Sequence, residues 1–138
     1  MAQITLDQNS NQINLVGSVV YGTEFYTERL NQFELPTADG SQVVYDGAGP
    51  NKRICLLAMK GLSYATGLVL ENWIKTKIVF ALNTFSMIPV TSGVDLGAGK
   101  GSTIQGARYR GANSTKGILE LVAPGTWDLK FPYYFIEN

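Results

Sequence analysis

Residues 53–77 read RICLLAMKGLSYATGLVLENWIKTK, and the spacing of their apolar side chains changes halfway along. From Arg53 to Met59, apolar side chains fall on both faces of an extended chain, which predicts a strand that is covered on both sides. From Ser63 onward, the apolar residues recur every three or four positions, which is typical of a helix with one buried stripe. The sequence therefore predicts a helix at about 63–77 that packs on a sheet.

Ser63 is suited to cap this helix, because its hydroxyl can accept a hydrogen bond from a free amide of the first turn. Glu71 and Lys75 are four residues apart in the order that favours an exposed ion pair. Gly67 costs a helix about 1 kcal/mol relative to alanine, so we expect a closely packed neighbour that requires it. The stripe expected to face the sheet contains Leu62, Thr66, Val69, Leu70, Trp73 and Ile74.

The rest of the chain has the short alternating segments and turn residues of a β-protein. Residues 4–6 and 13–16 alternate with period two around a polar loop and predict an N-terminal hairpin. Pro124-Gly125 is a strong turn signal and predicts a C-terminal hairpin between its flanking strands. Further strands are expected at 33–35, 43–45, 104–110, 117–122 and 127–131, with another at 78–80 or 84–88. The predicted fold is a single β-rich domain over 1–138, mainly β, a β-sandwich or β-barrel with one α-helix.

The residue types argue against an enzyme. The chain has no histidine, and its one cysteine, Cys55, lies in an apolar run. The commonest general base, the commonest metal ligand and the histidine-dependent dyads are therefore missing. The glycine-rich segment 97–102 departs from a phosphate-binding loop, since Gly101 stands where serine or threonine must follow the lysine. We therefore expect no catalytic residues, no metal and no cofactor.

Charge and hydropathy limit the classes of partner that the chain is expected to bind. Acidic and basic residues number 11 each, which argues against a nucleic-acid partner. No apolar run approaches the roughly 20 residues that span a bilayer, and the first residues lack a leader pattern, so no membrane partner is expected. Charged residues make up only 16%, against about 25% in typical domains. Two interpretations remain: a β-protein with neutral polar faces, or a subunit whose surface is covered by neighbours.

Two segments are candidates for a subunit interface. The loop 91–103 has four glycines and two charged residues, so we expect it to be mobile in an isolated subunit and ordered only against a neighbour. Residues 131–136 hold four aromatics, which cannot all face one core on an alternating strand. The predicted interface residues are Val94, Asp95, Leu96, Gly97, Gly99, Lys100, Tyr133, Tyr134 and Phe135.

The order of several segments resembles a known family. Trp73-Ile74 late in a helix is followed by TFSMIP at 84–89, GVDLGAG at 93–99, Ala107-Arg108-Tyr109 and Phe131-Pro132-Tyr133. This order, over roughly residues 54–136, resembles the small tail proteins of tailed bacteriophages, of the distal-tail or baseplate-hub type. The resemblance implies a β-sandwich or β-barrel subunit with one helix that forms rings around the tail axis.

The leading hypothesis is therefore a non-enzymatic virion structural protein, a ring-forming adaptor in the tail or baseplate. Such a protein would be made in the host cytoplasm and would contact copies of itself and other tail or baseplate proteins. One alternative is a small carbohydrate-binding β-sandwich, in which exposed tyrosine or tryptophan rings stack on sugars. Another is a capsid decoration protein.

Overall fold

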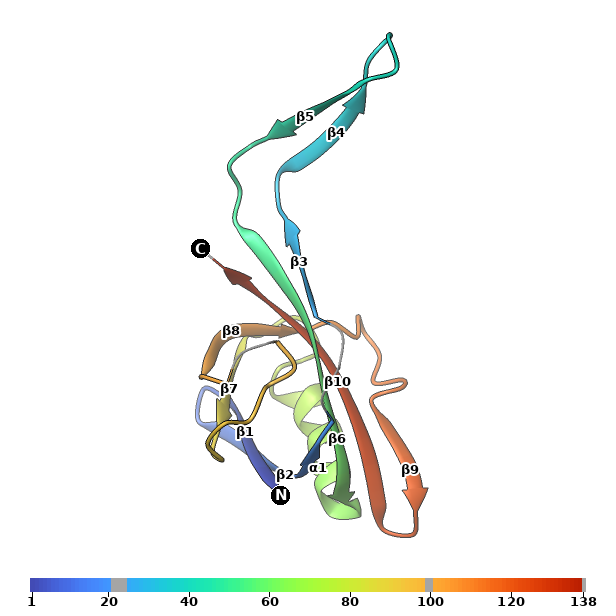
Figure 1. Cartoon of the computed structure of the whole chain (residues 1–138). Coiled ribbons are helices and arrows are strands. Elements are labelled where there is room, and N and C mark those ends of the chain that lie inside the picture. The colour runs from blue at the N-terminus through green and yellow to red at the C-terminus, as the bar shows by residue number, and fades with distance from the viewer. Residues whose placement is uncertain (21–24, 99–100, 138) are drawn as a thin grey trace.

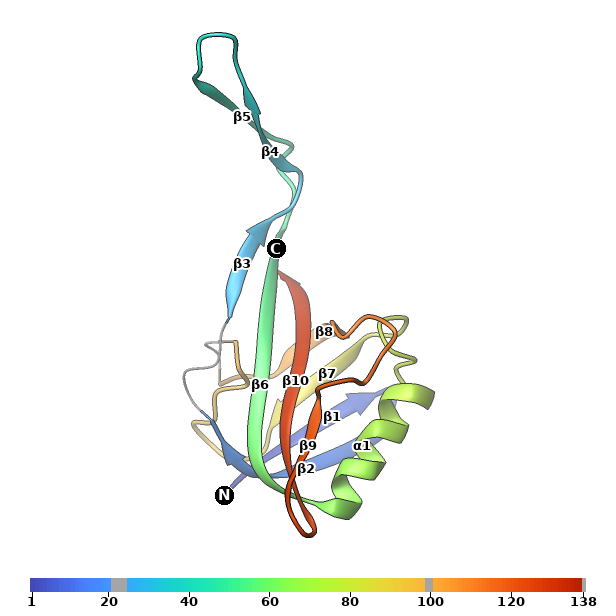
Figure 2. The same ribbon diagram turned by 90° about the vertical axis from the view of Figure 1, so that its right-hand side faces the viewer.

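The computed structural model describes residues 1–20, 25–98 and 101–137. Within these residues the chain is mainly β, with 54% of it in strands and with one helix, as the sequence predicts. Six of the described strands close into a barrel, and the helix packs against its side (Figures 1 and 2). A two-stranded arm projects from one end of the barrel.

Most elements overlap the predicted segments, but the strands at 51–63 and 126–137 are longer than predicted, and the strand at 26–29 was not predicted. The strands before the helix are β1 (Ala2–Gln8), β2 (Asn11–Val19), β3 (Tyr26–Arg29), β4 (Gln32–Pro36), β5 (Gln42–Asp46) and β6 (Asn51–Ser63). The helix is α1 (Tyr64–Thr76), and the strands after it are β7 (Phe85–Pro89), β8 (Ile104–Tyr109), β9 (Leu119–Ala123) and β10 (Thr126–Glu137). Both predicted hairpins, β1–β2 and β9–β10, are confirmed.

The barrel is built on two long strands, β6 and β10. Their antiparallel pairing runs from Ser63 opposite Thr126 to Asn51 opposite Glu137. Around the barrel the order is β6, β2, β1, β7, β8 and β10, and β10 then returns to β6. Outside the barrel, β3 pairs with the Asn51 end of β6, and β9 pairs with the Thr126 end of β10.

The interior contains the apolar residues that alternate along these strands. In β2, for example, Ile13 and Leu15 are buried, while Asn14 and Val16 are exposed. The turn before β2 is formed by Asn9 and Ser10, both with φ above zero (50° and 72°), which gives the twist of a two-residue hairpin. Among the most deeply buried side chains are Ile4, Leu6, Leu15, Leu57, Met59, Tyr109, Phe131 and Tyr133.

The helix is placed largely as predicted. Ser63 caps α1, with its hydroxyl accepting a hydrogen bond from the Thr66 amide at 3.2 Å. Leu70, Trp73 and Ile74 are buried, but Val69 is 55% exposed, so its prediction as a sheet-facing residue is wrong. The barrel touches a narrower arc of the helix than the predicted stripe covers, and Val69 lies beyond its edge.

Gly67 is also explained by packing. A Cβ built on Gly67 would lie 2.6 Å from Cδ1 of Trp127, so the indole ring occupies the space of a side chain. The closely packed neighbour that the sequence required is therefore Trp127 of β10. The predicted ion pair between Glu71 and Lys75 is formed on the exposed side of the helix, with 3.5 Å between Oε1 and Nζ.

Of the two strands proposed after the helix, residues 84–88 are correct and residues 78–80 are wrong. Val79 and Phe80 have φ of 48° and 54°, values that interrupt an extended strand, and the segment forms turns instead. Ile78 is nevertheless buried, because these turns fold its side chain into the core. The period-two pattern of three apolar residues was too short to distinguish these possibilities.

Candidate functional site

Part of the predicted interface loop, residues 94–98, lies in the barrel wall. Along the edge of β6 that faces away from β10, the strand pairs with β3 near Asn51 and with β2 near Lys60. Residues 94–98 fill the gap between these two pairings, and the Leu56 amide donates a hydrogen bond to the Gly97 carbonyl at 3.3 Å. A side chain on Gly97 would overlap the backbone of Leu56, so this approach requires glycine.

Further hydrogen bonds hold this segment. The Asp95 carboxylate accepts from the amides of Gly97 and Ala98 at 2.8 and 3.1 Å. The Tyr133 hydroxyl donates to the Leu96 carbonyl at 2.6 Å, and Arg53 Nη2 donates to the Ala98 carbonyl at 2.7 Å. Val94, Leu96 and Ala98 are all buried in the subunit's own core. The premise that this segment has little to bury in its own domain is therefore wrong for residues 94–98, and its mobility in an isolated subunit stays a prediction.

The C-terminal aromatics divide between the two faces of β10. Tyr133 and Phe135 point inward with Phe131 and are buried, and burial raises the pKa of the Tyr133 hydroxyl. Tyr134 points outward and is half-buried, with Lys52 Nζ at 4.2 Å from its ring centroid. Of the nine predicted interface residues, Gly99 and Lys100 lie outside the described residues, and five of the other seven are buried within the subunit. Their role in a subunit interface stays a prediction.

Cys55 is a core residue, as the sequence indicates. Its side chain is fully buried, and burial raises the pKa of its thiol to about 11. The thiol is therefore neutral near pH 7, and the thiolate that nucleophilic chemistry requires is disfavoured. In the part of the chain that the structure describes, no group of three or more His, Cys, Asp or Glu could hold a metal ion.

The structure also places opposite charges together in a way that the sequence did not indicate. Asp128 of β10 lies opposite Glu120 of β9 on one side and Lys60 of β6 on the other. With Lys130 they line a surface hollow of about 510 Å³. The hollow has two acids and two bases, so its charges compensate each other on a sheet surface.

Among the described residues, no helix is long and apolar enough to cross a membrane.

The most distinctive surface is the arm, residues 25–50. Its outer part is the β4–β5 hairpin, in which Phe33 lies opposite Tyr45 and Leu35 lies opposite Val43. Because side chains alternate along a strand, these four residues share one face of the ribbon. The other face carries Gln32, Glu34, Pro36, Gln42, Val44 and Asp46. The hairpin is therefore amphipathic, and we call Phe33, Leu35, Val43 and Tyr45 the apolar face of the arm.

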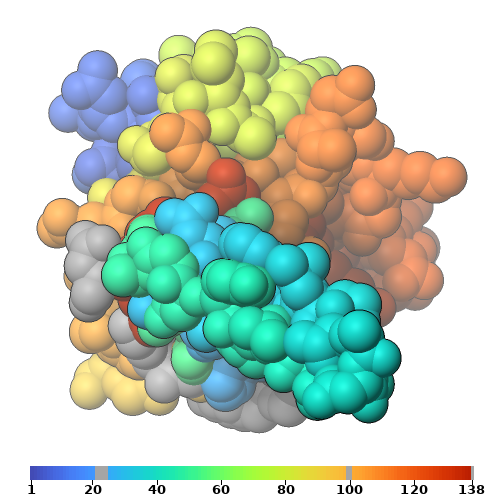
Figure 3. Space-filling model, turned by 90° about the horizontal axis from the view of Figure 1, so that it is seen from above, coloured from blue at the N-terminus to red at the C-terminus, as the bar shows by residue number. Residues whose placement is uncertain are grey.

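This apolar face is open to solvent in the single chain. Its four residues are 40–54% exposed, although all are large hydrophobic side chains. The rings of Phe33 and Tyr45 stack on each other, with centroids 5.3 Å apart and planes 19° from parallel. Viewed from above (Figure 3), the arm stands in front of the barrel as a separate ridge. The arm thus presents ordered apolar side chains away from the core.

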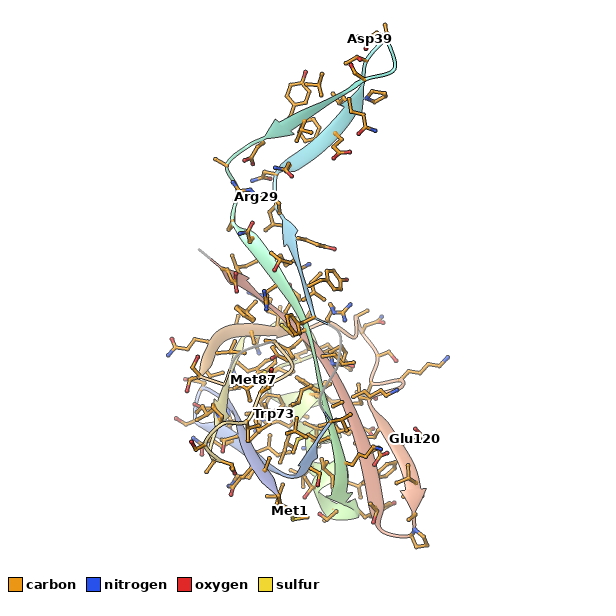
Figure 4. The ribbon with its side chains drawn as sticks, in the orientation of Figure 1. Met1, Arg29, Asp39, Trp73, Met87 and Glu120 are labelled. Carbon is orange, nitrogen blue, oxygen red and sulfur yellow. The ribbon has the colours of Figure 1, made fainter. Side chains whose placement is uncertain are left out.

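Polar contacts hold the arm at both its base and its tip. Figure 4 labels Arg29 at the base and Asp39 at the tip. At the base, Arg29 binds the Asp46 carboxylate through two nitrogens at 3.1 and 3.3 Å, and these hydrogen bonds lower the pKa of Asp46. At the tip, Asp39 accepts from the hydroxyls of Thr37 and Ser41 at 2.5 and 2.7 Å, and the pKa of Asp39 falls well below its usual range. Both carboxylates are therefore ionised at neutral pH, and the arm is preorganised.

Strands β4 and β5 of the arm were predicted, but β3 and the position of the arm were not. The sequence predicts strands at 33–35 and 43–45, and alternation of apolar and polar residues normally indicates a face packed on a core. Only the pairing of β3 with the end of β6 sends the hairpin away from the barrel.

No protein-family model matches this chain, and neither does any curated protein. The function is therefore inferred from the chain's own residues.

Proposed function

We propose that this chain is a non-enzymatic structural protein that assembles with copies of itself into a ring, as an adaptor in a virion tail or baseplate. The observation that carries the proposal is the exposed apolar face of the arm, at Phe33, Leu35, Val43 and Tyr45. An isolated two-stranded hairpin is at best marginally stable in water, and three or more strands or a packed face are needed to hold it. A neighbouring subunit supplies that packing.

The amount of apolar surface suits an assembly contact. Fully burying a side chain of this size contributes about 1.5–3 kcal/mol, so covering four half-exposed ones contributes roughly 1 kcal/mol each. A single contact of this size is weak, because association itself costs several kcal/mol in lost freedom. In a ring every subunit makes two such contacts, one through its own arm and one through a neighbour's arm. Ring closure therefore stabilises a contact that would be weak in an isolated pair.

The placement in a virion tail or baseplate has separate support. It rests on the resemblance of residues 54–136 to small phage tail proteins and on the low charged fraction of 16%. The carbohydrate-binding alternative has less support from the arm. Phe33 and Tyr45 stack on each other, so one face of each ring is already occupied where a sugar would stack.

The proposal is tested by removing the arm. Arg29 and Asn51 are opposite each other in the β3–β6 ladder, so residues 30–50 can be replaced by a two-residue Asn-Gly turn. We expect the purified chain to form particles of several times 15.0 kDa by light scattering, and the shortened chain to be a folded monomer. A shortened chain that forms the same particles as the complete chain would contradict the proposal. Electron microscopy of the particles then distinguishes a closed ring from a lattice such as a capsid decoration protein forms.

A further inference from the structure

A second exposed apolar surface lies where α1 meets the β9–β10 hairpin. Tyr64 stacks on Trp127, with ring centroids 5.5 Å apart and planes 16° from parallel. Leu68 follows Tyr64 by one helical turn and shares its side of α1, while Leu121 lies opposite Trp127 in the β-ladder. Tyr64, Leu68 and Leu121 are 48%, 49% and 54% exposed. We call Tyr64, Leu68, Leu121 and Trp127 the acceptor patch.

The acceptor patch and the arm lie at opposite ends of the molecule. Strand β6 begins at Asn51, at the base of the arm, and ends at Ser63, beside Tyr64. At about 3.3 Å per residue, these ends are about 40 Å apart. Figures 1 and 2 both show the arm pointing away from the end that holds the β9–β10 turn. The arm therefore points away from the patch of its own subunit.

The charges of the arm and of the rest of the chain are complementary. Residues 25–50 contain four acidic side chains and one basic one, Arg29. The remaining residues contain ten basic and seven acidic side chains. The net charge of zero is therefore the sum of an acidic arm with net charge −3 and a basic remainder with net charge +3. Opposite charges of this kind favour an encounter between the arm of one copy and the body of another.

We infer that the apolar face of the arm docks on the acceptor patch of a second copy of the chain. This inference rests on the proposed function and names the surface that receives the arm. The two surfaces differ, so the contact is heterologous, the type that closes into a ring when the rotation between subunits permits. Apolar side chains meet on both sides of this contact, and the opposite net charges of the arm and of the rest of the chain favour a second copy over an unrelated acidic partner.

Mixing two assembly-deficient variants tests this assignment. The arm variant carries Phe33→Thr and Tyr45→Thr and keeps its acceptor patch. The acceptor variant carries Leu68→Gln and Leu121→Thr and keeps its arm. We expect each variant alone to be monomeric, and an equimolar mixture to form a 1:1 dimer of twice the monomer mass of 15.0 kDa. The dimer fraction should rise with concentration, because this single contact is weak without ring closure. This dimer cannot grow, because its free arm and its free patch are the altered ones.

The control carries Leu82→Gln and Val90→Thr, at two exposed apolar positions outside the acceptor patch, and should assemble like the unaltered chain. An acceptor variant with the mass of the unaltered chain would overturn the inference but leave the proposed function standing. A mixture whose mean mass does not rise above that of the separate variants as the concentration is raised, while the unaltered chain assembles, would overturn it too. An unaltered chain that is itself monomeric would refute the proposed function, and the inference with it.

A second measurement does not depend on the stability of these variants. Because Cys55 is buried, cysteines introduced at Tyr45 and at Leu68 are the reactive thiols in their chains. When Tyr45→Cys and Leu68→Cys chains are mixed and oxidised, we expect a disulfide-linked heterodimer to predominate over either homodimer. Replacing the second chain by Leu82→Cys should reduce the yield at least tenfold. Equal yields with Leu68→Cys and Leu82→Cys would overturn the inference.

Discussion

Gly97 lies against the backbone of Leu56 so closely that a side chain on Gly97 would overlap the Leu56 carbonyl. The contact joins a glycine-rich segment to the long strand β6, 41 positions earlier in the printed sequence. It places residues 94–98 in the wall of the barrel, between the pairings of β6 with β3 and with β2. The segment therefore stabilises the subunit that it belongs to.

This contact predicts a large cost for Gly97→Ala. Gly97 has φ of +82°, so alanine there is strained by about 1 kcal/mol, and the clash with a fixed backbone adds roughly 1–3 kcal/mol more. Gly93 is a matched control, because its φ is +79° but an added Cβ would meet nothing within 4 Å. We expect urea denaturation to give a loss for Gly97→Ala at least twice that for Gly93→Ala. Equal losses would show that strain alone matters and that the close approach does not.

Trp73 tests the packing of the helix. Its side chain is buried, forms an edge contact with Phe85 and donates from Nε1 to the Asn11 carbonyl at 2.9 Å. We expect Trp73→Ala to lower the free energy of unfolding by roughly 3–5 kcal/mol. Val69→Ala on the exposed side of the same helix should change it by less than about 0.5 kcal/mol. A loss below about 1 kcal/mol for Trp73→Ala would contradict the described packing of α1.

These two regions show what local sequence patterns reveal. The helix was predictable because its period, its cap at Ser63 and the packing need of Gly67 are all properties of neighbouring residues. The position of Gly97 was not predictable, because it depends on a gap between two strand pairings formed by distant segments. Sequence could identify Gly97 as a residue suited to close approach, but could not show that the approached backbone is Leu56 of the same chain.

The arm differs from both the helix and the segment around Gly97. The alternation of Phe33 and Leu35 with polar residues correctly indicates an apolar face, and the structure leaves that face 40–54% exposed. A pattern of this kind normally marks residues that are buried in the functional state. The disagreement between the pattern and the single chain is therefore informative, and it is what a missing neighbour would produce.

Cys55 gives a prediction about pH. Burial raises the pKa of its thiol from 9.0 to about 11, so the folded state holds the proton more tightly than the unfolded state. Its contribution to stability is complete below pH 9 and is lost as the pH rises through 11. We expect the free energy of unfolding to fall more steeply between pH 9 and 11 in the unaltered chain than in Cys55→Ala, by up to about 1.4 kcal/mol per pH unit. Identical slopes would mean that the thiol reaches solvent in the folded state.

The central claim is that the apolar face of the arm drives self-assembly. Light scattering tests it most directly on two double variants, each of which alters one face of the same hairpin. Phe33→Thr with Tyr45→Thr changes a cross-strand pair on the apolar face, and Glu34→Thr with Val44→Thr changes the adjacent pair on the opposite face. We predict particles of several times 15.0 kDa for the unaltered chain and for the opposite-face variant, and a 15.0 kDa monomer for the apolar-face variant. An apolar-face variant that keeps the particle mass of the unaltered chain would contradict the claim.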